Sequence, residues 1–309
     1  MMTDSGYTIR NYRSSDLEGC ARLWQLEGQD QTGHYISPQI VKMLFEKPDF
    51  SAEETVLVAE KNGDIIACLN ITPELGIKHA NIHCIVHPEH RRKGIATSLF
   101  NQASEWIENA GAKAAHVGIL QKNAVAKKLM HKLGFKPVHQ FIEMQLTLDV
   151  KPAKILSTSV MIRHLKRGEE DRLADLQNRT FADHWGYNPN TVEDITSRLN
   201  RFHGSHQHVI LACDGDKPIA YCWTTTMLKT NPVTGKRHGR ILMLGVDPDY
   251  QSKSIGKAVL VAGLSSLFDR GVDVVEITAD SENKKARSLY KAAGFEGKAI
   301  SQYYEKVLE

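Results

Sequence analysis

An internal repeat constrains the fold of this chain of 309 residues more than any other feature. The segment Val86-His87-Pro88 reappears as Val246-Asp247-Pro248, at an offset of 160 residues, and the match continues without a gap to the Gly-Phe pair near the end of each copy. Self-similarity at a fixed offset is typical of repeated structural units. We therefore expect two domains of one fold, residues 1–150 and 158–309, joined by a linker at 151–157.

Each copy has the same order of expected elements. A short strand and two helices with amphipathic spacing come first. A β-hairpin follows, because Asn62-Gly63 and Asp214-Gly215 separate apolar runs and these residues tolerate positive φ. Next come a strand, a glycine-containing turn and a long helix, at 81–86 and 92–110 in the first copy and 241–246 and 253–270 in the second. A strand, a helix and a final strand close each copy.

This order of elements predicts the fold class. A strand, turn and helix that return to a neighbouring strand form a βαβ-like unit, here attached to hairpins. We expect an α/β (α+β mixed) protein of two domains, each with a mixed, mostly antiparallel twisted sheet flanked by helices.

The composition excludes some classes of function. The 39 basic and 36 acidic side chains give a net charge of +3, too balanced for nucleic-acid binding. The five cysteines lack the spacing of a zinc site or a disulfide framework, which favours a reducing compartment. The N-terminus is polar, and no run approaches the roughly 20 apolar residues of a membrane span. We expect a cytoplasmic monomer or homodimer that binds neither nucleic acid nor membrane.

The turn before the long helix predicts an anion site. In the first copy, Arg91, Arg92 and Lys93 precede Gly94 at the expected start of the helix. Unpaired N–H groups in the first turn carry a partial positive charge, and glycine lets them approach a pyrophosphate. The loop alone is equally compatible with a helix N-terminus bearing solvated basic residues. Ser254 replaces this glycine in the second copy, and a positive φ there would cost about 1 kcal/mol and weaken cofactor binding.

The complete pattern in both copies resembles the acyl-CoA signature of the GNAT superfamily of N-acetyltransferases. That signature is Arg/Gln-x-x-Gly-x-Gly/Ala after a strand ending in Val-x-Pro, then Asn-x-x-Ala-x-x-Leu-Tyr-x-x-x-Gly-Phe. The first copy departs from it at Met130, in the tyrosine position, and the second at Ser254. The order of parts is similar to the tandem, mycothiol synthase-like branch, in which the C-terminal half does the chemistry. The matching residues include Arg91, Gly94, Ala96, Asn123 and Ala126 in the first copy and Gln251, Gly256, Asn283, Ala286, Leu289 and Tyr290 in the second.

The resemblance implies an acyl-CoA-dependent enzyme that transfers an acetyl group from acetyl-CoA, or another acyl-CoA, to a primary amine of a small molecule. It implies that amides at the helix start hold the diphosphate and that the preceding strand pairs with pantetheine. The cofactor-binding residues implied in the second copy are Leu244, Gly245, Val246, Gln251, Ser252, Lys253, Ser254, Ile255, Gly256, Lys257 and Asn283. Those implied in the first copy are Cys84, Ile85, Val86, Arg91, Arg92, Lys93, Gly94, Ile95, Ala96, Thr97 and Asn123.

Tyr290 is the expected catalytic acid. Acyl transfer from a thioester requires a donor for the departing thiolate, and a tyrosine hydroxyl can supply that hydrogen bond. Met130 has no proton to donate, so we assign catalysis to the second copy. The resemblance also implies that a backbone N–H near Val246 polarises the carbonyl.

The general base is less evident from the sequence. Many members of the superfamily have a glutamate near the position of Arg240, which cannot accept a proton. Asp183 and His184 are candidate catalytic residues, because with Trp185 they follow the first helix of the second copy, where this fold covers the acceptor groove. An alternative is that Asp183 caps a helix and Trp185 fills the core. His238 is a further candidate base.

Two other functions are compatible with the sequence. Met130 and the missing glutamate favour a non-catalytic protein that binds or senses acyl-CoA. Acetylation of protein lysines or N-termini is the other alternative. His203, His206 and His208 are interpreted as a loop, and no metal site is expected.

Overall fold

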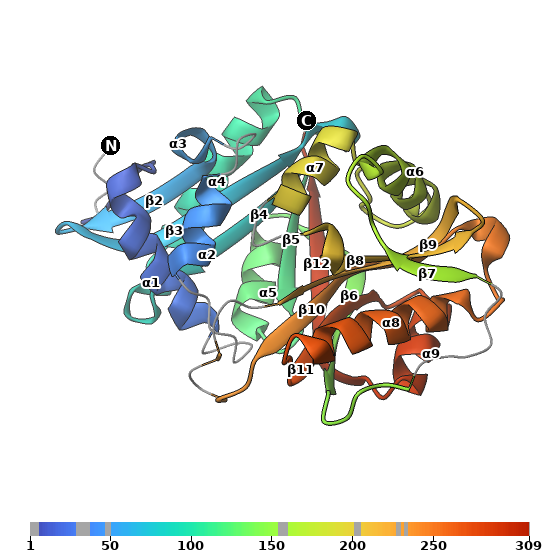
Figure 1. Ribbon diagram of the computed structural model, residues 1–309. Coiled ribbons are helices and arrows are strands. Elements are labelled where there is room, and N and C mark those ends of the chain that lie inside the picture. The colour runs from blue at the N-terminus through green and yellow to red at the C-terminus, as the bar shows by residue number, and fades with distance from the viewer. Residues whose placement is uncertain are drawn as a thin grey trace. The chain divides into compact units, whose positions relative to one another are not determined.

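The computed structural model describes residues 6–28, 38–46, 51–153, 160–200, 205–226, 230–231 and 234–308. The chain forms two compact units (Figure 1). Unit 1 contains residues 1–140 and 301–309, and unit 2 contains residues 141–300. Of the expected linker, 151–153 is described as irregular chain, and the remainder lies outside the described residues. Among the described helices, none combines the length and apolar character needed to cross a bilayer.

Unit 1 is built on six neighbouring strands of a β-sheet, with helices on both faces. Its strand order is β1-β2-β3-β4-β5-β12, with β4 and β5 parallel and the other neighbours antiparallel. The elements are β1 (Thr8–Asn11), α1 (Leu17–Glu27), α2 (Pro38–Phe45), α3 (Ala52–Thr55), β2 (Val56–Lys61), β3 (Asp64–Glu74), β4 (His79–Val86), α4 (Ile95–Asn109), β5 (Ala114–Leu120), α5 (Ala124–Lys132) and β12 (Glu296–Val307).

Apolar side chains on the strands of unit 1 point to both faces of the sheet and form two apolar cores. Successive strand residues point to opposite faces. On one face, Leu23 of α1 and Val41 of α2 pack over Val58 and Ile85, and Figure 1 shows α1 and α2 lying across these strands. On the other face, α4 packs over β3 and β5. The odd-numbered residues 115 and 117 of β5 belong to the second core, so the even-numbered residues of β5 face the α1/α2 side.

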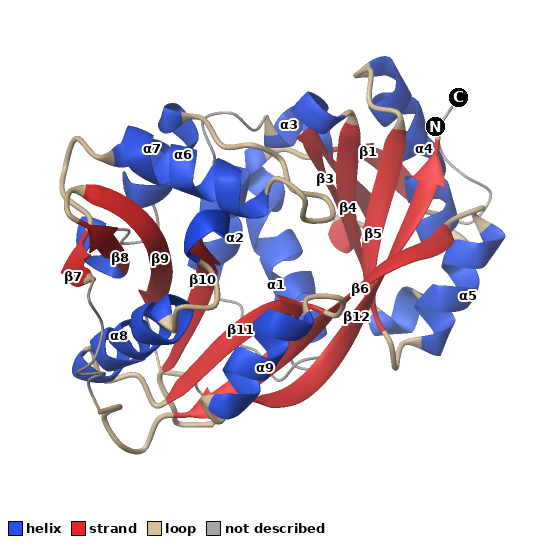
Figure 2. Ribbon diagram, turned by 90° about the vertical axis from the view of Figure 1, so that its right-hand side faces the viewer, coloured by secondary structure: helices blue, strands red, loops and turns tan. Residues whose placement is uncertain are grey.

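Unit 2 has the same architecture. Its strand order is β6-β11-β10-β9-β8-β7, with β10 and β11 parallel. α6 and α7 cover one face and α8 and α9 the other (Figure 2). The elements are β6 (Lys136–Thr147), β7 (Met161–His164), α6 (Glu170–Phe181), α7 (Val192–Asn200), β8 (Val209–Asp214), β9 (Lys217–Thr226), β10 (His238–Val246), α8 (Ile255–Asp269), β11 (Val274–Asp280) and α9 (Lys284–Ala292).

The two copies of the repeat exchange their last strands. Residues 141–147 of β6, from the first copy, pair with β11 of unit 2. Residues 301–307 of β12, from the second copy, pair with β5 of unit 1. The compact units and the sequence repeats therefore divide the chain differently: each sheet is completed by a strand encoded in the other copy.

The local predictions hold with two corrections. Asn62 and Gly63 have φ of 53° and 88°, as the expected hairpin turn requires, but the turn of the second hairpin lies at 215–216, one residue later than expected. The long helices begin at Ile95 and Ile255 rather than at 92 and 253. The reason is that residues 92, 94, 252 and 254 are left-handed, with φ between 58° and 81°, and an α-helix cannot include them.

Candidate active site

The parallel strands β10 and β11 separate toward their carboxyl ends. Their ladder ends where Ile241 pairs with Ile277. β10 also carries an extra residue, Leu242, in a β-bulge relative to β9. A bulge bends its strand and increases the local twist. Residues 244–246 therefore border an open fork in the sheet of unit 2.

Unit 1 has a fork without a bulge. The ladder between β4 and β5 ends at Asn81 opposite His116. The pairing of β4 with β3 continues without a register shift from His79 to Val86. Each unit thus has its own fork between two parallel strands, and only the fork of unit 2 lies next to a β-bulge in the described residues.

Backbone directions identify which residues can pair with a ligand in the fork of unit 2. The Asp247 N–H donates to the Ile219 carbonyl at 2.8 Å. Polar groups of successive strand residues point to opposite edges, so those of Leu244 and Val246 point into the fork. Gly245 points its polar groups at β9.

Gly245 has a steric role instead. A Cβ at this position would lie 2.5 Å from Thr180 Cγ2 and 2.7 Å from Tyr221 Cε1. Real Cβ contacts are not that short, so glycine is what allows the end of α6 to approach β10.

Backbone directions also identify which residues of unit 1 face its fork. The His87 N–H donates to the Ile66 carbonyl at 2.9 Å, so Cys84 and Val86 present their polar groups to the fork. Ile85 points its polar groups toward β3, and its buried side chain packs beneath α1.

The loop before α8 presents a run of unpaired amides. Within the described residues, the backbone N–H groups of Ser252, Lys253, Ser254, Ile255, Gly256 and Lys257 donate no hydrogen bond. The first helical bond runs from the Ala258 N–H to the Ser254 carbonyl at 3.1 Å. Gln251 is exposed, and its side chain accepts from Lys285 at 3.4 Å.

The loop before α4 has the same construction. Among the described residues, the N–H groups of Arg92, Lys93, Gly94, Ile95, Ala96 and Thr97 are likewise unpaired, and the Ser98 N–H donates to the Gly94 carbonyl at 3.0 Å. Arg91 is exposed and its Nε donates to the Val86 carbonyl at 3.1 Å, which ties the loop to the edge of the fork. Each unit can therefore hold a diphosphate on backbone donors beside its fork.

Ser254 adopts the left-handed conformation expected from its alignment with Gly94. Its φ is 58°, against 81° for Gly94. A Cβ in this region is strained by about 1 kcal/mol.

We expect Ser254→Gly to raise the free energy of unfolding by about 1 kcal/mol, because it relieves this strain. Denaturant unfolding of the full chain measures the change. Ser265→Gly, the same substitution within α8, is the control and should lower stability by a few tenths of a kcal/mol to about 1 kcal/mol. If Ser254→Gly lowered the free energy of unfolding as Ser265→Gly does, the proposed backbone strain at residue 254 would be contradicted.

Tyr290 of α9 lies beside the fork of unit 2. Its side chain is buried and packs against Phe295 with ring centroids 6.0 Å apart. Burial, and then the nearby Cys222, raises the pKa of Tyr290. Cys222 stands opposite Leu244 in the pairing of β9 with β10. Within the described residues, the Tyr290 hydroxyl has no hydrogen-bond partner, and Met130 is buried at the same position of unit 1.

Asp183 and His184 lie in the turn between α6 and α7, but their side chains lie in different environments. The Asp183 side chain is exposed. The His184 ring packs against Phe181 with centroids 4.7 Å apart. The Phe181 ring in turn comes within 3.2 Å of where a Cβ on Gly245 would lie. His184 therefore belongs to the surroundings of β10, whereas Asp183 is at the surface.

Trp185 lies in the same turn, and its ring faces one residue of β6. Its ring lies 6.0 Å from that of Phe141, which pairs with Asp280 at the carboxyl end of β11. The indole is half-buried. Its place at this end of the sheet is compatible with a wall of an acceptor groove.

His238 and Arg240 are not brought to the fork. His238 begins β10, about 26 Å from Val246 at the rise of an extended strand. It is buried, with its Nδ1 atom 2.8 Å from Glu276 Oε1. Arg240 donates from Nη2 to Thr278 Oγ1 at 2.6 Å. The suggestion of His238 as general base thus loses its geometric basis.

Strand exchange brings in a carboxylate that no motif of the second copy indicates. Glu143 of β6 stands opposite Thr278 in register, so both side chains lie on the α6/α7 face. Thr278 is the residue that binds Arg240. Because the sequence assigns this strand to the first domain, no pattern in the second copy points to Glu143.

Another ionisable group that no sequence motif indicates lies at the fork of unit 1. His83 follows the end of the β4/β5 ladder, and its Nε2 atom is 2.9 Å from Glu27 Oε2. Its ring lies 4.6 Å from that of Trp24. Burial lowers the pKa of His83, but the carboxylate of Glu27 more than offsets this, so the net pKa is raised.

The two asparagines of the motif, Asn123 and Asn283, have a structural role in this chain. Asn283 Oδ1 accepts from the Ala286 N–H at 2.9 Å, and Asn123 Oδ1 accepts from the Ala126 N–H at 3.0 Å. Each oxygen caps a helix. The amide nitrogen of each side chain is the part left to contact a cofactor.

The remaining predictions concern cysteines and histidines. All five cysteines carry free thiols. His206 Nε2 lies 2.6 Å from Glu170 Oε1, and His206 and His208 lie in a 3-10 turn before β8. His203 lies outside the described residues.

Comparison with known proteins relates this geometry to a family. Residues 19–135 and 171–295 each match the acetyltransferase (GNAT) family. A mycothiol acetyltransferase of Sanguibacter keddieii is 31% identical over 225 residues, which cover 70% of each chain. One from Kocuria rhizophila is 24% identical over 256 residues, covering 79% of this chain and 82% of its own. A GCN5-related N-acetyltransferase from Sphaerobacter thermophilus superposes over 100% of this chain and 98% of its own, with a TM-score of 0.79 and 21% identity.

Both copies of the repeat therefore match one family, and the matched segments contain the fork, the amide loop and the helix that carries Tyr290 or Met130. The chain belongs to the GNAT family of acetyltransferases, as a tandem member with two copies of the family's domain.

Proposed function

We propose that the chain transfers the acetyl group of acetyl-CoA to a primary amine of a small molecule, and that the reaction takes place in unit 2. The observation that carries this proposal is the Tyr290 hydroxyl, which has no partner among the described residues and lies beside the fork. The mycothiol acetyltransferases to which the chain is similar support a small-molecule acceptor.

The residues of unit 2 fit a diphosphate cofactor with an extended arm. The unpaired amides of 252–257 would hold the diphosphate. The polar groups of Leu244 and Val246 would pair with the arm, since they point into the fork. Bound acetyl-CoA would supply the acetyl thioester.

Two groups of unit 2 then act on the reacting atoms. The Val246 N–H is proposed to polarise the thioester carbonyl, because it is a fixed donor at the edge of the fork. Tyr290 is proposed to donate a hydrogen bond to the departing thiolate. Its raised pKa keeps the phenol protonated at neutral pH, so the hydroxyl is a hydrogen-bond donor there.

His184 is the proposed acceptor of the amine proton. A neutral imidazole has one ring nitrogen that accepts a proton. Its contact with Phe181, which approaches Gly245, supports this role better than the exposed position of Asp183 does. Glu143, which lies on the α6/α7 face opposite Thr278, is a second proposed acceptor.

We propose a cofactor-binding role without turnover for unit 1. Its amide loop has the same conformation, with glycine at the position where unit 2 has Ser254. Met130, however, replaces the tyrosine donor.

The experiment that tests the proposed function is release of free CoA thiol from acetyl-CoA in the presence of a panel of amines. The panel contains aminosugars, amino acids, polyamines and lysine-containing peptides. We expect thiol release with at least one small amine, and mass spectrometry should find the acetyl group on its nitrogen. Calorimetry with CoA measures cofactor binding in parallel.

Two results would contradict the proposal. CoA binding without thiol release for any amine would favour a sensing protein. Transfer to peptides with none to small amines would favour a protein acetyltransferase.

A further inference from the structure

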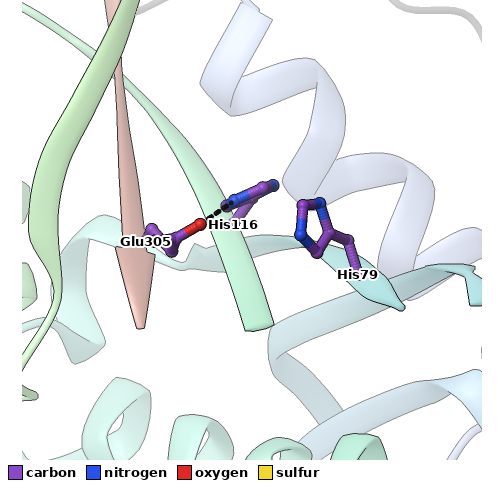
Figure 3. Close-up of side chains that lie close together, drawn as sticks. All are labelled: His79, His116 and Glu305. Atoms are coloured by element: carbon purple, nitrogen blue, oxygen red, sulfur yellow. Dashed lines mark hydrogen bonds and ion pairs between the residues drawn. The ribbon is translucent and has the colours of Figure 1, made fainter. Parts of the chain in front are cut away.

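Three potential metal ligands converge in unit 1, away from the fork. They are His79 of β4, His116 of β5 and Glu305 of β12, shown in Figure 3. One ligand atom from each lies within 4.8 Å of the other two. In the described part of the chain, no other cluster of three His, Cys, Asp or Glu side chains meets this condition.

Strand pairing explains why these side chains meet. Glu305 stands opposite His116 in the antiparallel pairing of β12 with β5. His79 pairs with Ala114, two residues before His116 on β5, and so its ring lies next to that of His116. The two ring centroids are 4.5 Å apart, edge to face. Strand exchange is essential here, because Glu305 comes from the other copy of the repeat.

The hydrogen bonding of the cluster is incomplete. His116 Nε2 lies 2.9 Å from Glu305 Oε2. The Nδ1 atom of His79 is buried without a hydrogen-bond partner. Nearly all buried polar atoms in proteins have a partner.

We propose that His79, His116 and Glu305 form a binding site for one divalent transition-metal ion of the zinc type. Two imidazoles and one carboxylate are a ligand set that zinc accepts, with water in the fourth position. Ligand atoms around tetrahedral zinc lie about 3.4 Å apart. Because the ligand atoms of the cluster all lie within 4.8 Å of one another, no pair needs to approach by more than roughly 1.4 Å. The half-buried His79 and the Glu305 side chain, which is 28% exposed, leave room for this movement.

Unit 2 supplies an internal comparison. The residue equivalent to His116 is Glu276, which pairs with His238 at 2.8 Å and stands opposite Gln145 in register. Gln145 takes the place of Glu305. This position of unit 2 therefore offers two ionisable ligands rather than three, and we expect one metal ion per chain.

The bound ion would stabilise the pairing of the exchanged strand β12 with β5. Glu305 belongs to the second copy of the repeat, whereas His79 and His116 belong to the first. Metal bound to all three holds β12 against β5. This role does not depend on which unit carries out acetyl transfer.

The test uses the full chain without a purification tag, stripped of metal with a chelator and titrated with zinc chloride by calorimetry. We expect a stoichiometry of one. His79→Ala and Glu305→Gln should each weaken zinc binding by at least about 10-fold, since even partners of metal ligands contribute about 10- to 100-fold. Glu305→His, which restores a third ligand, should bind zinc more tightly than Glu305→Gln. His164→Ala, which removes an exposed histidine of unit 2, is the control and should bind like the wild type.

Hydrogen exchange provides a readout that separates this site from nonspecific binding. Zinc should slow exchange of the amides of 301–307 in the wild type and not in Glu305→Gln. The proposal is overturned if zinc does not bind, if the double variant His79→Ala with Glu305→Gln binds as tightly as the wild type, or if protection of 301–307 is unchanged by zinc.

Discussion

Ser254→Glu is expected to abolish acetyl transfer, whereas Gly94→Glu should leave turnover within about two-fold of the wild type. A glutamate at either position places a negative charge among amides that are proposed to hold a diphosphate. Each hydrogen bond to a charged oxygen contributes about 1.5 to 3 kcal/mol, so the loss of two weakens binding about 10²- to 10⁴-fold. The effect on turnover depends on which unit carries out the reaction.

The measurement combines initial rates with calorimetric titration by CoA. We expect two binding sites in the wild type and one in each variant. Gly94→Asn and Ser254→Asn are matched controls, because asparagine tolerates positive φ without adding charge. If Gly94→Glu abolished activity and Ser254→Glu did not, the reaction would take place in unit 1 rather than in unit 2. An unchanged number of sites in Gly94→Glu would mean that the loop before α4 does not bind CoA.

Tyr290→Phe is expected to lower kcat by about 10²-fold, with the affinity for CoA within about two-fold of the wild type. General acid catalysis contributes roughly 10² to 10⁴ in rate. The substitution removes only the hydroxyl, which has no partner among the described residues, so folding stability should not fall. Rates at saturating acetyl-CoA and thermal unfolding of the variant measure the two effects.

Tyr304→Phe is the matched control, because Tyr304 is a buried tyrosine of unit 1 outside the proposed site. It should retain wild-type turnover. The pH profile supplies a further check: the pKa of Tyr290 is raised above its usual value of 10, so ionisation of this phenol should cause no loss of rate below pH 10. Full activity of Tyr290→Phe would contradict the assignment of Tyr290 as the donor to the departing thiolate.

Local features of the site were predictable from the chain because they depend on short segments. The alignment of Ser254 with Gly94 predicted a serine in a left-handed conformation, and its φ is 58°. The same alignment paired Tyr290 with Met130, and both side chains are buried at equivalent positions. The helices begin later than the basic residues at 92 and 253 suggest, because helix propensity favours these residues while the left-handed conformations of 92, 94, 252 and 254 prevent a helix.

The destination of the last strands was not predictable. Residues 141–147 and 301–307 belong to equivalent strands of the two copies, and each could complete either sheet. Hydrophobic alternation specifies which face of a strand is buried, but it does not specify which equivalent edge the strand joins. Glu143 beside Thr278, and Glu305 beside His116, therefore had no signal in the sequence.

The sequence by itself determined the repeat, the fold class, the amide loops and the difference between Tyr290 and Met130, because each is encoded within a contiguous stretch or in the register between two copies. The tertiary structure alone decided the bulge at Leu242, the direction of the backbone groups at Leu244 and Val246, and the strands shared between the copies. Those features depend on pairing between distant segments, whose free energy depends on the neighbouring strand as well as on the residues of the strand itself.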